Sequence, residues 1–127
     1  MTTSGADIFK PVLGKTITKL YLHDNALHIV FSDGTRMMVF DDGQQCCETR
    51  YMRTDDNLND FANSKLISVD ISASVSHNEE YSIVHEIQFM RIHTSKGIIT
   101  FSNHNENNSG YYCGFEIAAI FNNKEVA

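Results

Sequence analysis

The stretch ALHIVFSDGTRMMVF, residues 26–40, decides the fold class. Its first part alternates between apolar and other residues, and the apolar ones are Leu27, Ile29 and Phe31. Such alternation is typical of a strand that buries one face. The dipeptide Asp33-Gly34 follows, and because both residues tolerate positive φ, its place between two apolar runs favours a tight turn. The stretch therefore predicts an antiparallel hairpin.

Further strands are predicted on both sides of this hairpin. Residues 15–22 alternate imperfectly, whereas residues 66–75 alternate cleanly. In the second of these runs, the side chains expected to point inward are Ile67, Val69, Ile71, Ala73 and Val75. A second hairpin is predicted where the Lys96-Gly97 turn joins two more strand-like runs.

Two segments leave alternatives open. In residues 84–95 the apolar face changes at Phe89 and Met90, which indicates either a strand covered on both sides or a bulge. Residues 115–121 fit an edge strand somewhat better than one or two turns of helix. Under every alternative the chain is mainly β.

One short helix is predicted between the two hairpins, around residues 55–62, with Asp55 and Asp56 at the favourable end of its dipole. The expected fold class is α+β, mainly β, with about six antiparallel strands in a curled sheet or half-barrel. No repeat or linker divides the chain, so we expect a single domain over residues 1–127, with residues 1–13 loosely held.

Composition excludes several classes of protein. Sixteen acidic against ten basic residues give a net charge of -6, and direct nucleic-acid binding is not expected without clustered Lys and Arg. No apolar run approaches the roughly 18 residues of a membrane span, and the start lacks the layout of an export signal. The three cysteines, two of them adjacent, make a poor disulfide framework and suit a reducing cytoplasm. Metal-ligand spacing is missing, so neither a metal nor a cofactor is expected.

Two predicted loops, residues 46–56 and 104–115, hold most of the unusual side chains. The candidate binding residues in them are Cys46, Cys47, Glu48, Arg50, Tyr51, Asp55, Asp56, His104, Asn105, Glu106, Tyr111 and Tyr112. One interpretation brings both loops into a single polar pocket, where Arg50 pairs with Glu48 or Glu106 and a tyrosine offers a stacking face. In the other interpretation, the cysteines are buried apolar groups, Arg50 forms an ion pair with a loop carboxylate, and the tyrosines cover the end of the sheet.

No catalytic residue is assigned. Cys46 or Cys47 with His104 or His85 would supply a nucleophile and a base. The chain nevertheless lacks a nucleophile elbow, a glycine-rich oxyanion loop and a phosphate-cradling loop. A cysteine and a histidine without that context are a weak signal.

The strings CCETRYMRTDD, residues 46–56, and HNENNSGYYCGF, residues 104–115, resemble an uncharacterised family of small bacteriophage and prophage proteins. That family has Cys-Cys-Glu, Arg-Tyr-Met and Thr-Asp-Asp steps and a loop His-Asn-Glu-His-Asn-Gly-Tyr-Tyr-Gly-Gly-Phe. This chain departs from the pattern at three positions. Asn107 replaces a histidine, Ser109 is a one-residue insertion, and Cys113 replaces a glycine. Loss of the histidine weakens the hypothesis of a metal site or of catalysis by a histidine pair. The resemblance implies a phage or prophage origin, hence a bacterial cytoplasm, and brings no known activity.

Size, acidity and this resemblance together favour a phage-encoded, non-enzymatic binding protein. We expect it to inhibit a host defence component, such as a CRISPR effector, through an acidic surface that contains aromatic residues. The alternative is a sponge for a nucleotide signal, with Arg50 on phosphate and a tyrosine on the base. A Cys/His or metal-dependent enzyme is the third reading. The expected partners are a host protein or a small nucleotide, and a homodimer that pairs exposed sheet edges is also physically sensible.

Overall fold

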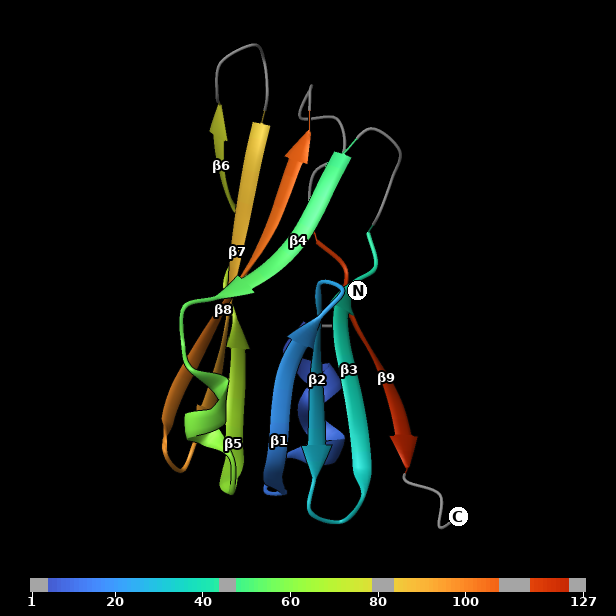
Figure 1. The fold of residues 1–127 in the computed structure, drawn as a ribbon. Coiled ribbons are helices and arrows are strands. Elements are labelled where there is room, and N and C mark those ends of the chain that lie inside the picture. The colour runs from blue at the N-terminus through green and yellow to red at the C-terminus, as the bar shows by residue number, and fades with distance from the viewer. Residues whose placement is uncertain (1–4, 44–47, 79–83, 108–114, 124–127) are drawn as a thin grey trace.

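The computed structural model describes residues 5–43, 48–78, 84–107 and 115–123. Within these ranges the chain forms nine strands and two short 3₁₀ helices (Figure 1). The strands are β1 (Thr16–His23), β2 (Ala26–Phe31), β3 (Thr35–Asp41), β4 (Glu48–Thr54), β5 (Ser64–Ile71), β6 (Val75–Asn78), β7 (Val84–Thr94), β8 (Gly97–Asn107) and β9 (Ile117–Asn123). The helices are η1 (Gly5–Val12) and η2 (Leu58–Phe61).

All the strand pairs are antiparallel, and the order across the sheet is β4-β8-β7-β5-β1-β2-β3-β9, with β6 pairing beside β7. The sheet is open, because β4 and β9 are its two ends. The first half of the sheet consists of β1, β2, β3 and β9, and the second half consists of β4, β5, β7 and β8 with β6 beside β7. The two halves meet where β5 pairs briefly with β1, at Thr16↔Lys65 and Ile17↔Ser64 (Figure 1). The prediction of a mainly β, antiparallel fold with a short inserted helix is confirmed, with nine strands in the described ranges instead of about six.

One hydrophobic core joins the two halves of the sheet and η1. Its buried members are Phe9, Val12, Ile17, Leu20, Leu27, Ile29, Phe31, Met37, Val39, Met52, Leu66, Met90, Ile92, Ile99 and Phe101. They come from η1 and from β1, β2, β3, β4, β5, β7 and β8. The curled sheet therefore encloses apolar side chains from both of its halves, and burial of that apolar surface is the main force that holds it together.

The β2–β3 hairpin forms as predicted, with Leu27, Ile29 and Phe31 buried on one face. Gly34 has φ 92°, which places the glycine where the turn requires a left-handed residue. The antiparallel pairing of β1 with β2 agrees with the strands predicted on either side of residues 24–25. There Asp24 and Asn25 have φ values of 53° and 59°, the geometry that a tight antiparallel turn favours.

Two bulges explain where simple alternation failed. The register of β1 shifts between Ile17 and Lys19, which accounts for the imperfect pattern of residues 15–22. A second shift lies between Leu66 and Ser68. The predicted inward position of Ile67 is therefore wrong: this side chain is 54% exposed, and Leu66 is buried. The predicted inward position of Val75 is also wrong, since this first residue of β6 is 53% exposed.

Part of the segment that we expected to be loosely held, residues 1–13, has a defined structure. Residues 5–12 form η1, whose Phe9 and Val12 are buried in the core. Directly after η1, the backbone N–H of Gly14 donates to the carbonyl of Leu66 at 2.7 Å. Burial of these two apolar side chains explains why residues 5–12 have a defined structure. The glycine and proline content of the segment does not reveal this burial.

The β7–β8 hairpin positions the candidate site. Its two strands have eleven residues each and pair in unbroken register from Val84↔Asn107 to Thr94↔Gly97, so the apolar face of β7 does not change through a bulge against β8. Strand β4 continues the sheet along β8, although residues 46–56 were predicted to be a loop. No helix in the described ranges is long and apolar enough to cross a membrane.

Candidate functional site

The inner face of the β7–β8 hairpin changes from apolar to polar along its length. Close to the turn it carries the buried Met90, Ile92, Ile99 and Phe101. Farther from the turn, Gln88 lies opposite Asn103 and Glu86 opposite Asn105. Glu86, Asn103 and Asn105 are 4%, 1% and 0% exposed. Burial of polar groups is unfavourable unless partners satisfy them, so this end of the sheet is unusual for a structural core.

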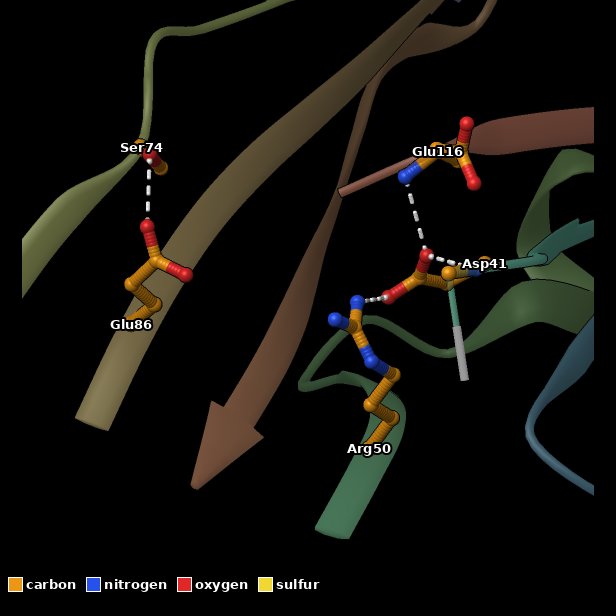
Figure 2. A network of polar contacts seen from close by, with 6 residues as sticks. Asp41, Arg50, Ser74, Glu86 and Glu116 are labelled. Carbon is orange, nitrogen blue, oxygen red and sulfur yellow. Dashed lines mark hydrogen bonds and ion pairs between the residues drawn. The ribbon is translucent and has the colours of Figure 1, made fainter. Parts of the chain in front are cut away.

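An ion pair closes this polar end against the first half of the sheet. Arg50 of β4 and Asp41 of β3 approach to 2.6 Å between Nη1 and Oδ2, and their side chains are 5% and 10% exposed. The other oxygen of Asp41 accepts hydrogen bonds from the backbone N–H groups of Gly43 and Glu116, both at 3.0 Å (Figure 2). Asp41 therefore ties the end of β3 to β4 and to the segment before β9.

Glu86 has an identified partner on the neighbouring segment. Its Oε2 accepts a hydrogen bond from the Ser74 hydroxyl at 3.2 Å, apart from the Asp41–Arg50 pair (Figure 2). The amide groups one row closer to the core differ. Both Oδ1 and Nδ2 of Asn103, and Oε1 of Gln88, are buried without a hydrogen-bond partner in the described part of the chain. A buried polar atom in this state costs about 1–3 kcal/mol.

Asn103 also lines a cleft of about 380 Å³ between the β1–β2 turn and β4. The other walls that matter are Asn25 and Ala26 at the turn, Phe40 at the end of β3, and Arg50 and Tyr51 of β4. The volume lies within the range of small-ligand sites, and the walls combine aromatic surface with a few polar groups, as such sites do.

The outer face of β4, β8 and β7 carries a second polar cluster. The rings of Tyr51 and His104 stack at 4.6 Å between centroids, with an interplanar angle of 6°. The Tyr51 hydroxyl donates to Glu106 Oε2 at 2.5 Å. His104 Nδ1 lies 2.9 Å from His85 Nε2, and His104 Nε2 lies 2.8 Å from Ser102 Oγ. Three strands thus contribute to one connected set of side chains.

His104 has a pKa below the ordinary histidine value. Partial burial is the largest cause, followed by the nearby His85 and Arg53, while Glu106 acts in the opposite direction. Burial disfavours the charged ring, and neighbouring cationic groups do the same. His104 is therefore a neutral imidazole at pH 7, with one nitrogen that accepts a hydrogen bond and one that donates.

A groove of about 370 Å³ extends from this cluster along the outer face. It is lined among others by Arg53, Asp55, Asp56, Phe89, Ser102 and His104. Asp56 has a structural role at its far end, since its carboxylate accepts a hydrogen bond from the backbone N–H of Thr100 at 2.8 Å. The groove therefore offers a base, a hydroxyl and a guanidinium at one end and carboxylates at the other.

The structure brings together only part of the predicted binding set. Tyr51, His104 and Glu106 meet on the outer face, whereas Arg50 pairs across the cleft with Asp41. Asn105 is buried on the inner face, and Asp55 and Asp56 line the far end of the groove. The remaining members lie outside the described residues or have undescribed side chains: Cys46, Cys47, Glu48, Tyr111 and Tyr112.

Sequence reasoning missed several side chains of these two sites, namely Glu86, Gln88, Ser102 and Asn103, and considered His85 only as a base for the cysteines. A signal for the inner group is present in β7, where Glu86 and Gln88 share a face with Met90 and Ile92. In the described part of the chain, no group of three or more His, Cys, Asp or Glu side chains is arranged to hold a metal ion.

Fold and site together define an open antiparallel β protein with polar groups gathered on both faces of one end of its sheet. The model of a family described as a domain of unknown function (DUF7448) matches residues 10–117. That match spans most of the chain, so the protein belongs to this family. Neither a curated protein nor a solved structure matches it.

Proposed function

We propose that this chain is a binding protein that holds a small polar ligand in the cleft beside Asn103. The observation that carries the proposal is the Asn103 amide, which is 1% exposed, lines the cleft and has no hydrogen-bond partner among the described residues. A ligand that pairs with this amide would remove the cost of leaving it unsatisfied, and that gain is specific for the correct ligand.

The walls of the cleft indicate the chemistry of the ligand. An amide presents a donor and an acceptor side by side, which matches the edge of a nucleobase or of another cyclic amide. Phe40 supplies aromatic surface against which a planar ring can pack. Arg50 is paired with the Asp41 carboxylate, so it contributes little net positive charge for a phosphate. We therefore expect the cleft to recognise the hydrogen-bonding edge of a planar ring through the Asn103 amide. We do not expect Arg50 to contact a phosphate of the ligand.

Native mass spectrometry and calorimetric titration with a panel of nucleobases, nucleosides and nucleotides test this proposal. We expect binding by the wild type and loss of binding in Asn103→Leu, which has similar volume and no hydrogen-bonding group. Gln88→Leu is the matched control, because it removes a neighbouring buried amide that is not among the cleft residues. Equal affinity of Asn103→Leu and wild type for a ligand would refute the proposal.

A protein partner is the second candidate, favoured by exposed apolar side chains on the outer face. Ile67, Phe89 and Ile98 are 54%, 37% and 51% exposed on β5, β7 and β8. Aromatic and aliphatic anchors rimmed by charge are typical of interface centres, and the net charge of -6 would speed association with a basic partner. In this proposal the protein is phage-encoded and blocks a host defence component, as the strings at residues 46–56 and 104–115 suggest by resemblance.

Phage plating on bacteria that carry individual defence systems separates the two candidates. The measured quantity is the ability of the protein to restore phage plating on such bacteria, called rescue here. If a protein interface is responsible for rescue, Phe89→Ser together with Ile98→Lys should abolish it, and Asn103→Leu should leave it intact. If the cleft carries the effect, the two variants should behave in the opposite way. Rescue that survives in all of these variants would contradict both candidates.

A further inference from the structure

A serine, two histidines and an arginine converge on the outer face, and we propose that they form a hydrolytic site for small carboxylic esters, with Ser102 as the nucleophile. The site is separate from the Asn103 amide, because successive residues of β8 point to opposite faces of the sheet. The inference therefore stands apart from the proposed ligand cleft.

The strand register places the reacting groups around Ser102. His104 follows two residues later on β8 and so shares its face. Arg53 of β4 and Phe89 of β7 are the direct cross-strand neighbours of Ser102, one on each side. All four residues line the groove of about 370 Å³. The serine thus lies between a base, a cation and an apolar wall.

His104 has the contacts that a general base for Ser102 requires. Its Nε2 lies 2.8 Å from Ser102 Oγ, and its Nδ1 lies 2.9 Å from His85 Nε2. With the proton on Nδ1, the ring donates to His85 and leaves Nε2 to accept the serine proton. A nucleophile, a base within hydrogen-bond reach and a third group that orients the base are the general signature of an activated hydroxyl.

The surroundings of the pair support both states of His104. The lowered pKa of His104 keeps the ring neutral, and hence competent as a base, at pH 7. When it takes up the serine proton, His85 Nε2 accepts its Nδ1–H, and the Glu106 carboxylate lies 3.9 Å from His85 Nε2. Tyr51 stacks on the ring and donates to Glu106, which holds the ring and the carboxylate in place.

The proposed reaction proceeds in two steps. Ser102 Oγ attacks the carbonyl carbon while its proton moves to His104 Nε2, and the carbonyl electron pair moves to an oxyanion that the Arg53 guanidinium stabilises. The carbonyl then re-forms, the bond to the alcohol oxygen breaks, and the alcohol leaves with the proton from His104. Water, deprotonated by His104, next attacks the acyl–Ser102 ester and releases the carboxylic acid, and the proton returns to Ser102.

The groove also indicates the class of ester. Phe89 is 37% exposed beside Ser102 and provides an apolar surface for a short acyl chain. Asp55 and Asp56 line the same groove and would repel an anionic alcohol group. The expected substrates are small, uncharged esters with an apolar acyl group.

Hydrolysis of p-nitrophenyl butyrate by the full chain, followed through release of the coloured phenolate, tests the proposal. We expect the wild type to exceed the buffer rate and to be labelled once by a fluorophosphonate, at Ser102. Ser102→Ala should lose both properties, and His104→Gln should lower kcat by about 10²- to 10⁴-fold. Ser68→Ala and His93→Gln are matched controls, since these residues face each other across β5 and β7 and should leave the rate unchanged.

His85 is a positioning residue, and its variant has a distinct signature. His85→Gln should lower kcat while KM stays constant. A wild type no faster than buffer, a Ser102→Ala variant that retains the rate, or a label on another residue would overturn the proposal.

Discussion

The β2–β3 and β7–β8 hairpins are both antiparallel, and they differ in the side chains on their inner faces. The inner face of the first is apolar from Leu27 and Ile29 to Met37 and Val39, all buried, and becomes polar only at Asp41, the last residue of β3. The inner face of the second is apolar near its turn and polar beyond it, from Gln88 and Asn103 outward. A continuous apolar face would hold both hairpins equally well. The polar end of β7–β8 therefore carries buried amide and carboxylate groups at a cost that an apolar face would not have.

The largest expected effect comes from removing one partner of the ion pair between the two halves. Arg50→Met should lower the free energy of unfolding by about 3–5 kcal/mol, because it leaves the Asp41 carboxylate buried without its cation. Urea denaturation monitored by circular dichroism measures this change. The double variant Arg50→Met with Asp41→Asn is the control and should recover most of the loss, because asparagine is uncharged and keeps an oxygen that accepts from Gly43 and Glu116. A loss below about 1 kcal/mol, as for an exposed pair, would mean that the pair does not hold the halves together.

Truncation in the apolar hairpin should have a comparable or slightly smaller effect. Ile29 is fully buried in the core, so Ile29→Ala should cost about 2–5 kcal/mol through lost burial and the cavity that remains. Ile98→Ala is the matched control on the other hairpin, because this side chain is 51% exposed, and it should change stability little. Equal losses in the two variants would show that the core is not where the burial pattern places it.

A smaller effect concerns pH. The pKa of His104 is lower in the folded chain than the ordinary value of 6.5, so the unfolded chain binds more protons between the two values. The contribution of His104 to stability is complete above pH 6.5 and is lost as pH falls from there towards the folded pKa. The melting temperature of the wild type should therefore fall more steeply below pH 6.5 than that of His104→Gln. Parallel curves for the two proteins would contradict this assignment.

Local signals in the sequence predicted one hairpin well and the other poorly. Alternation and the Asp33-Gly34 step suffice for β2–β3, because turn chemistry and apolar pattern agree there. The segment from His104 to Asn107 is rich in asparagine and was predicted to be a loop, yet it pairs with β7 and β4 to the end of β8. Cross-strand hydrogen bonds outweigh the weak strand propensity of asparagine, and no local pattern reports them.

The candidate site was predictable in its parts and not in its arrangement. Tyr51, His104 and Glu106 were all singled out, and their meeting on one face follows from the β4–β8 register, in which Tyr51 lies opposite His104. That register becomes apparent only when β4 is recognised as a strand. One interpretation paired Arg50 with Glu48 or Glu106, and the other with an unspecified loop carboxylate. Its identified ion pair is with Asp41, a residue of another strand whose approach depends on the curl of the sheet.

The proposed ligand cleft depends most directly on Asn103, so the decisive measurement is the free energy of unfolding of Asn103→Leu against wild type in urea, without ligand. If the amide is kept for a ligand, leucine removes two unsatisfied buried atoms and should raise the free energy of unfolding by about 1–3 kcal/mol. A loss of stability of similar size would show that the Asn103 amide is satisfied within the folded chain. Asn103 would then be structural, and the proposal that it binds a ligand would be wrong.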